Sequence, residues 1–158
     1  MAIEIRRPTK VETGEIIRMM RDFAELEGLS DVFENNIVKL SESIFAGSAY
    51  VEALVAKDGD RYAGYALFFP FFASFRGQHG YYLDDLYIDP AFRGTGLGEA
   101  FLREIARLGA ERGYVRIDLQ VRDGNTKAIG FYEKLGAVLD SEDRHFKFTD
   151  AAFRNLAK

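Results

Sequence analysis

The stretch Leu86-Tyr87-Ile88-Asp89-Pro90, followed after two residues by Arg93-Gly94-Thr95-Gly96-Leu97-Gly98, decides the fold of this chain. Its first three residues predict a short apolar strand, and Asp89-Pro90 marks a turn. Beyond the glycines, apolar residues recur every three or four positions, which predicts a long amphipathic helix. These apolar residues are Leu97, Phe101, Ile105 and Leu108. A strand, a glycine-rich turn and a helix are therefore expected in direct succession.

The glycine-rich segment, residues 93–98, has the properties of an anion site. Glycines let backbone N–H groups approach an anion without interference from side chains, and a helix N-terminus adds partial positive charge. The spacing is not Gly-x-Gly-x-x-Gly, because Glu99 stands five residues after Gly94. It is not a Walker loop either, because no Gly-Lys-Ser/Thr follows. The remaining pattern, Arg-x-x-Gly-x-Gly before a helix, favours phosphate binding.

Composition limits the class of protein. At 158 residues, 47% hydrophobic and 29% charged, the chain is predicted to form one domain over residues 1–158. The absence of cysteine excludes disulfides, thiolate metal sites and an acyl-cysteine intermediate, and a net charge of −4 argues against nucleic acid as a partner. The N-terminal residues lack the apolar run of a signal peptide, and the longest apolar stretch, 66–73, is too short to span a membrane. We therefore expect a cytoplasmic protein with no membrane partner.

Strand and helix patterns fill the rest of the chain. Thr13 can cap a first helix that ends near Gly28, and a second helix is expected to stop at Gly47. Gly113 and Gly136 stand where two later helices should end. Strands are predicted over 3–5, 50–56, 61–69, 81–88, 115–121, 137–139 and 145–148, with an aromatic loop over 70–80. This order predicts an α/β (α+β) fold.

These segments together resemble the GNAT family of acyl-CoA N-acyltransferases, and within it the spermidine/spermine and thialysine N-acetyltransferases. The matching segments are Ala24-Glu25-Leu26-Glu27, Tyr82-Leu83-Asp84-Asp85-Leu86-Tyr87-Ile88, the loop at 93–98, Asn125, Phe131-Tyr132 and Gly136-Ala137. Gly28-Leu29-Ser30-Asp31 is most similar to the thialysine members, whereas the chain is a few residues shorter between Gly136 and Phe146. The resemblance implies a GNAT fold with a mixed, mostly antiparallel twisted sheet of six to seven strands and about four helices. It also implies a homodimer.

The resemblance implies where acetyl-CoA binds. The pyrophosphate is expected on the backbone amides of Arg93, Gly94, Thr95, Gly96, Leu97 and Gly98. The pantetheine arm is expected to pair with the backbone of Leu86, Tyr87 and Ile88 as an added strand, where an amide of Leu86 or Ile88 polarises the thioester oxygen. Leu86 and Ile88 can also be core residues, since side chain and backbone have separate roles.

Two residues after this region are expected to contact the cofactor. Tyr132 has apolar neighbours three residues away on either side, so helical spacing alone favours a core aromatic residue. The family match instead implies a general acid, because a phenol with a pKa of about 10 can protonate a thiolate whose thiol has a pKa of about 8.5. Asn125 is expected to bind the pantetheine arm; its alternative role is the cap of the helix that follows.

Adjacent aspartates stand in the predicted strand at 81–88. Aspartate is depleted in strands, and two in succession point to opposite faces of a sheet, so one carboxylate needs a partner or a solvated cleft. The partner of a salt bridge would be Arg116 or Arg61. Alternatively, Asp84 reaches the acceptor cleft, where it binds the ammonium of the substrate or accepts its proton through water. The family has Glu at this position.

Acidic residues crowd the turn between the first two helices: Glu25, Glu27, Asp31 and Glu34. Such a run is commonly a solvated face. The family match implies that Leu26 and Glu27 contact the acceptor, with Glu142 as a further candidate, and that the acidic turn attracts a cationic amine. Arg76, Arg122 and Arg144 are candidate partners for an α-carboxylate.

The sequence therefore predicts an acetyl-CoA-dependent N-acetyltransferase without a metal. The acceptor is a lysine-like amine or a polyamine, attacked directly in a ternary complex. The alternatives are a non-catalytic acyl-CoA-binding module and an enzyme that acetylates a protein N-terminus or lysine. His79 and His145 lack partners at metal-ligand spacing, so neither is assigned a catalytic role. The apolar run at 67–72 is expected to pack against a second chain or to fill the core.

Overall fold

The computed structural model describes residues 3–158, which form two compact units. The first unit extends to Gln120 and the second begins at Val121. The first unit holds the whole sheet, whereas the described part of the second unit contains helices only. A single domain over residues 1–158 stays a prediction.

A five-stranded sheet organises the first unit, in the order β1-β2-β3-β4-β5. All neighbouring strands are antiparallel except β4 and β5, which are parallel, so the expected mixed, mostly antiparallel sheet is confirmed. The strands are β1 (Glu4–Arg6), β2 (Glu52–Asp58), β3 (Arg61–Ala73), β4 (Gln78–Ile88) and β5 (Arg116–Leu119). The helices of this unit are α1 (Thr13–Leu26), α2 (Ile37–Phe45) and α3 (Leu97–Glu111), with short 3-10 turns at Lys10–Glu12, Ser30–Val32 and Pro90–Phe92.

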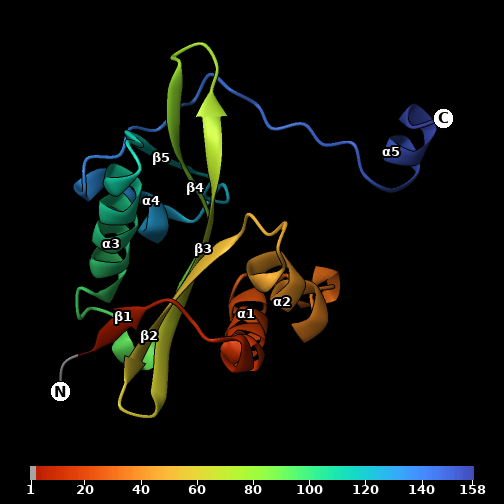
Figure 1. The fold of residues 1–158 in the computed structure, drawn as a ribbon. Coiled ribbons are helices and arrows are strands. Elements are labelled where there is room, and N and C mark those ends of the chain that lie inside the picture. Colours follow the sequence, from red (N-terminus) through yellow and green to blue (C-terminus); the bar gives the residue numbers. More distant parts are fainter. Residues whose placement is uncertain (1–2) are drawn as a thin grey trace. The chain divides into compact units, whose positions relative to one another are not determined.

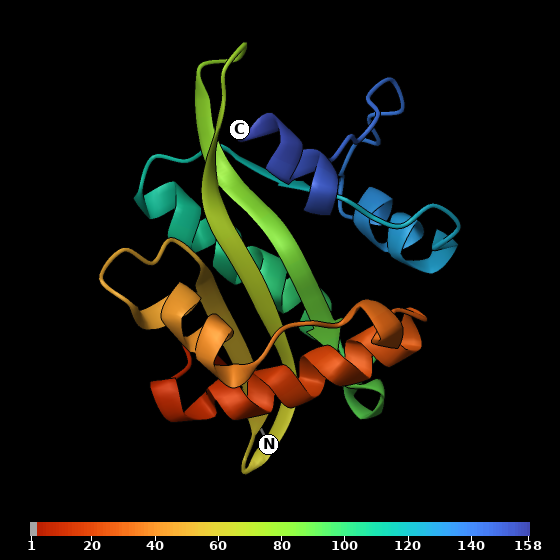
Figure 2. The ribbon, with the colours of Figure 1, turned by 90° about the vertical axis from the view of Figure 1, so that its right-hand side faces the viewer.

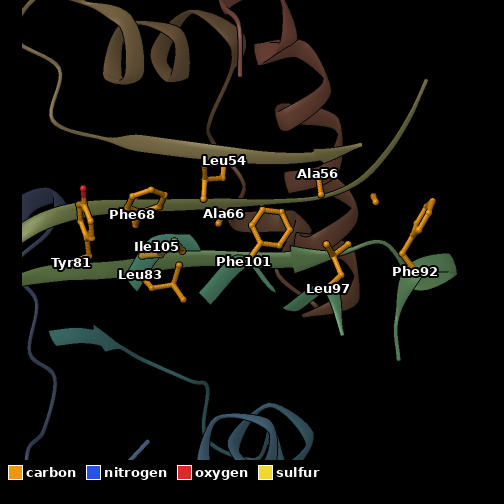
Figure 3. Packing of buried hydrophobic residues seen from close by; sticks show 11 residues of the cluster. Leu54, Ala56, Ala66, Phe68, Tyr81, Leu83, Phe92, Leu97, Phe101 and Ile105 are labelled. Atoms are coloured by element: carbon orange, nitrogen blue, oxygen red, sulfur yellow. The ribbon is translucent and has the colours of Figure 1, made fainter. Parts of the chain in front are cut away.

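Helices cover both faces of this sheet (Figures 1 and 2), with α1 and α2 on one face and α3 on the other. Phe101 and Ile105 of α3 are fully buried against Phe68 and Tyr81 of the sheet (Figure 3). On the opposite face, Ile16 of α1 and Leu40 of α2 belong to a second apolar cluster. The 3.6-residue period of the helices and the alternation of the strands therefore produce two cores, one on each side of the sheet.

The hairpin of β3 and β4 corrects the expected aromatic loop. Residues 70–80 are not a loop throughout, because β3 continues to Ala73 and β4 already begins at Gln78. Rings on facing residues stabilise this extension, as Phe72 lies opposite His79 with ring centroids 4.8 Å apart. Cross-strand aromatic pairs of this kind favour the extended backbone over a loop.

The second unit corrects the expected strand count. It contains α4 (Thr126–Lys134) and α5 (Asp150–Leu156), whereas the strands expected over 137–139 and 145–148 are absent from the described structure. The sheet accordingly has five strands instead of six to seven, and residues 3–158 form five α-helices instead of about four. Val138 and Phe146 are 91% and 86% exposed. A short apolar pattern alone does not make a strand when no neighbouring strand pairs with it.

A β-bulge interrupts β4 at Asp84. Along β3 the register runs without a gap, with Leu67 opposite Asp85 and Phe68 opposite Leu83, so Asp84 has no partner on β3. The register also places Leu83 opposite Leu119, the last residue of β5. The bulge therefore stands where β5 ends, and Asp85 shares a face with Tyr82 although three positions separate them.

Candidate active site

The junction of β4 and α3 is built around unoccupied backbone donors. Asp89 Oδ1 accepts a bond from the Ala91 amide at 2.9 Å, and Thr95 Oγ1 donates to the Phe92 carbonyl at 2.6 Å. Gly94 and Gly96 adopt φ angles of 74° and 83°, which favour glycine. Among residues 3–158, no acceptor is recorded for the amides of residues 94–98. These donors at the start of a long helix match an anion site.

The glycine positions leave this loop open. A Cβ atom added at Gly94 or Gly96 would meet no heavy atom within 4 Å. Neither glycine is therefore required by close packing within the described chain, and both are required by their backbone angles. The space directly beside the backbone of these two glycines is therefore open.

The outer edge of β4 is open beyond the bulge. In the described structure β5 pairs only with residues 80–83 of β4, so residues 84–88 have a strand neighbour on one side alone. Such an edge presents unpaired N–H and C=O groups to an extended ligand. Nε of Arg93 donates to the carbonyl of Ile88 at 3.1 Å, which ties the loop to the end of this edge.

The side chains of this edge serve the two cores. Leu86 and Ile88 pack against the cluster under α3, whereas Tyr87 is buried in the cluster under α1. The core role considered for Leu86 and Ile88 is thus confirmed for their side chains. Apart from the Ile88 carbonyl, which accepts a bond from Arg93, their backbone faces no neighbouring strand on the open side in the described structure.

Asp84 stands exposed at the bulge, and partial desolvation raises its pKa above the ordinary value. The salt bridges considered for the aspartate pair are absent from the described residues. Arg116 instead binds Asp118 at 2.8 Å, and the guanidinium of Arg61 lies over the ring of Phe92. The bulge also replaces the expected simple alternation of the two aspartates across the sheet.

Asp85, to which the sequence reasoning assigned no site role, is half-buried beneath this edge. Tyr65 Oη donates to Asp85 Oδ2 at 3.1 Å. Burial, and next the charge of Asp84, raise the pKa of Asp85 to about 6, although the Tyr65 bond opposes this shift. The only sequence signal was the occurrence of two acidic residues inside a strand, because Tyr65 is twenty positions away.

The acidic turn follows the C-terminal end of α1. Glu27 is half-buried at the helix terminus, Leu26 is exposed, and Glu25, Asp31 and Glu34 are exposed. Phe23 lies four positions before Glu27, hence on the same side of the helix, and stacks on Tyr87 with centroids 5.7 Å apart. The end of α1 is therefore packed on the part of β4 that carries the open edge.

Three predicted site residues belong to the second unit. Asn125 Oδ1 accepts a bond from the Ala128 amide at 3.1 Å, so the helix-cap role is confirmed. Tyr132 is half-buried in α4, and desolvation raises its pKa to about 12. Glu142 is exposed in the segment without regular secondary structure. The loop, the β4 edge, Asp84 and the acidic turn belong to the first unit.

A separate pocket of about 520 Å³ contains none of the predicted site residues. Its polar wall is formed by Glu52, which binds Arg7 at 2.6 Å and Arg112 at 2.7 Å. Arg112 stands at the C-terminal end of α3, the opposite end from the glycine loop. This ion triad joins segments of the fold remote from the loop.

Comparison with known proteins identifies the family. The model of the acetyltransferase (GNAT) family matches residues 15–137, so the chain belongs to this family and is an acetyltransferase. Within the family, the thialysine N-epsilon-acetyltransferase of Sus scrofa is 31% identical over 99% of this chain and 98% of its own. The L-ornithine N5-acetyltransferase of Arabidopsis thaliana is 34% identical over 61% of this chain and 42% of its own.

Structural comparison gives the same fold. An integron cassette protein from V. cholerae superposes with a TM-score of 0.80 and 23% identity, covering 100% of this chain and 99% of the other. Among the helices of residues 3–158, none has both the length and the apolar character needed to cross a bilayer. The same residues contain no group of three His, Cys, Asp or Glu arranged to hold a metal ion.

Proposed function

We propose that this enzyme transfers an acetyl group from acetyl-CoA to a primary amine of a small cationic acceptor, by direct attack in a ternary complex. The observation that carries this proposal is the open β4 edge leading into a loop of unpartnered amides at residues 94–98. Family membership and the thialysine relatives support the same reaction. A homodimeric, cytoplasmic enzyme folded as one domain remains part of this proposal.

The residues of the first unit fit acetyl-CoA. The free amides and the N-terminus of α3 suit its pyrophosphate, with Arg93 beside them, and the backbone of residues 86–88 suits the amide groups of its pantetheine arm. When bound, acetyl-CoA supplies the acetyl thioester. An amide at Leu86 or Ile88 would polarise the thioester oxygen.

Tyr132 is the proposed general acid, and Asn125 the proposed contact to the pantetheine arm. A pKa of about 12 keeps the Tyr132 phenol protonated at neutral pH, so it holds a proton to give to the departing sulfur. Asn125 begins the helix that carries Tyr132, so its cap on Ala128 fixes the start of that helix.

The acceptor is proposed to be a lysine-like amine in preference to a long polyamine. Asp84 and Glu27 of the first unit, with Leu26 and Glu142, are the proposed contacts, and carboxylates favour a cationic amine. The named relatives acetylate the side-chain amines of thialysine and ornithine, both amino acids. Acetylation of a protein substrate has no comparable support.

The proposal predicts that thiol is released when the purified protein receives acetyl-CoA and a suitable amine. Putrescine, spermidine, lysine and thialysine are compared by kcat/KM with a thiol reagent, which meets no background from a chain without cysteine. We expect thialysine and lysine to exceed the polyamines. Binding of CoA without thiol release from any amine would instead identify a non-catalytic acyl-CoA-binding module.

A homodimer is proposed from the tip of the β3–β4 hairpin. Leu67 and Phe68 fill the core, but Phe72 and Phe75 are 55% and 105% exposed. Such rings favour contact with a second copy.

Light scattering at micromolar concentration should give about twice 17.9 kDa. Replacing both rings with Glu should halve this mass, whereas Val11→Glu, at another exposed apolar residue, should not. A parent mass near 17.9 kDa would refute the dimer.

A further inference from the structure

Asp85 is a half-buried carboxylate whose recorded hydrogen-bond donor is neutral. Tyr65 Oη donates to it at 3.1 Å, and the Tyr65 side chain is fully buried on β3. Within residues 3–158 no lysine, arginine or histidine forms an ion pair with Asp85. A buried carboxylate is normally paired with a cation or neutralised. Residues 3–158 therefore provide Asp85 with orientation and with no recorded positive charge.

The groups that face Asp85 come from three elements. Tyr65 belongs to β3, and Asp84 and Tyr87 belong to β4. Phe23 of α1 covers Tyr87, which lies 5.9 Å from Tyr65 between ring centroids. Two charged residues of α1, Arg18 and Asp22, bind each other at 2.9 Å. Burial raises the pKa of Tyr87, and the charges of Asp22 and Arg18 act on this pKa in opposite directions. Asp85 is therefore held against aromatic residues beside the open edge of β4.

Asp85 and Asp84 differ in how firmly they are held. Asp84 is exposed at the bulge, without a partner in the register and without a recorded hydrogen bond among the described residues. Asp85 has a register partner, Leu67, and a fixed side-chain oxygen. A fixed carboxylate is better suited to hold a ligand in one orientation, because its side chain loses less conformational freedom when the ligand binds.

We propose that Asp85 binds the ammonium group of the acceptor, and that Tyr65 is the positioning residue that orients this carboxylate and favours its ionised form. This inference rests on the proposed function and deepens it. The binding of a cationic acceptor should then follow the ionisation of Asp85. A raised pKa, about 6, places this ionisation close to neutral pH.

The first test is a titration that needs no substrate. The carboxyl signal of Asp85 is identified by carbon-13 NMR from its loss in Asp85→Asn, and its midpoint is followed with pH. We expect a midpoint near 6 in the parent protein. In Tyr65→Phe it should rise by about 0.5 to 1, since the lost hydrogen bond favoured the charged form. A parent midpoint near the ordinary 3.8 would overturn the proposal.

The control is Tyr62→Phe on the same strand. Tyr62 Oη donates to a different carboxylate, Glu12 Oε1, at 2.8 Å. This variant therefore loses a matched tyrosine–carboxylate bond and should leave the midpoint of Asp85 unchanged. An equal rise in both variants would show a general effect of losing a phenol hydroxyl and would overturn the role of Tyr65.

The second test measures acceptor binding. The dissociation constants of thialysine and putrescine, which stay cationic between pH 5 and 8, are measured by calorimetry in the presence of CoA. Asp85→Asn should weaken binding about 10-fold or more at pH 7.5, the loss expected for a hydrogen bond to a charged group. Tyr65→Phe should weaken binding at pH 6, where a smaller fraction of Asp85 is ionised in the variant than in the parent. At pH 8 it should weaken binding little, since Asp85 is ionised in both proteins at that pH.

The outcomes separate this inference from the proposed function. If the parent binds an amine and Asp85→Asn binds it equally well, the role of Asp85 is refuted and the proposed function stands. If none of the amines causes the parent to release thiol, and the parent binds neither probe, both the role of Asp85 and the proposed function are refuted. Circular dichroism confirms that each variant is folded. Asp84→Asn, run in parallel, should weaken binding less than Asp85→Asn.

Discussion

Tyr132→Phe should lower kcat roughly 10-fold or more while the fold and the affinity for CoA survive, since general acid catalysis contributes about 100-fold or more. The substitution removes the hydroxyl and keeps the ring, which lies 5.0 Å from Phe131 between centroids. Because burial raises the pKa of Tyr132 to about 12, the parent phenol stays protonated from pH 7 to 9. The loss should therefore be similar throughout that range.

The measurement is kcat with saturating acetyl-CoA and amine, together with the dissociation constant of CoA. Tyr114→Phe is the control, because Tyr114 is an aromatic contact of Tyr81 in the first unit. It should retain the parent kcat. If Tyr132→Phe turns over like the parent from pH 7 to 9, Tyr132 is not the general acid and its ring has a packing role alone.

Glu12→Gln should lower the free energy of unfolding by about 3 kcal/mol, the size of effect expected when a buried ion pair loses one partner. Glu12 is 7% exposed and accepts bonds from Arg6 at 2.8 and 2.9 Å, from the Thr9 amide at 2.7 Å and from Tyr62 Oη at 2.8 Å. A glutamine has no charge for Arg6. Urea unfolding at pH 7 measures the change.

The pH dependence of this effect has a definite sign. The Arg6 guanidinium holds the pKa of Glu12 well below its ordinary value of 4.5. The ionised group therefore stabilises the fold fully above pH 4.5, and this contribution is lost as the pH falls toward the lowered pKa. The difference between parent and Glu12→Gln should be constant near neutral pH and should shrink in acid.

Glu15→Gln provides the matched control for Glu12→Gln. Glu15 pairs with Arg18 at 2.9 Å on the exposed side of α1, where both side chains are more than 40% exposed. Exposed pairs contribute about 0–1 kcal/mol, so this variant should differ little from the parent. Equal losses in the two variants would mean that burial of Glu12 contributes nothing.

The sequence predicted the parts of the fold that local physics determines. The start of a helix near Thr13, the end of α3 near Gly113 and the capping role of Asn125 are confirmed, because apolar period, glycine and cap residues are visible locally. The expected cap at Thr13 is wrong, since Thr13 is the first residue of α1 and its Oγ1 donates to the Lys10 carbonyl at 2.7 Å. The glycine loop was identified for the same reason. Its open amides follow from the helix N-terminus that the pattern predicted.

The sequence did not predict features that depend on distant pairing. The bulge at Asp84 is invisible in the pattern, because it exists only relative to β3. The bond between Tyr65 and Asp85 needs the same register. The strands expected at 137–139 and 145–148 were wrong for the opposite reason, since a local apolar pattern was present without a neighbouring strand to pair with.

The bulge has a consequence for how this segment can change over evolution. Tyr81 and Leu83 pack under α3, and so do Leu86 and Ile88, because one extra residue stands between the two pairs. Loss of that residue would turn one pair away from the core, whereas a different side chain at the same place would leave both pairs buried. Selection for a folded protein thus acts on the length of this segment. The type of side chain at position 84 is therefore free to change under selection for the reaction that the enzyme catalyses.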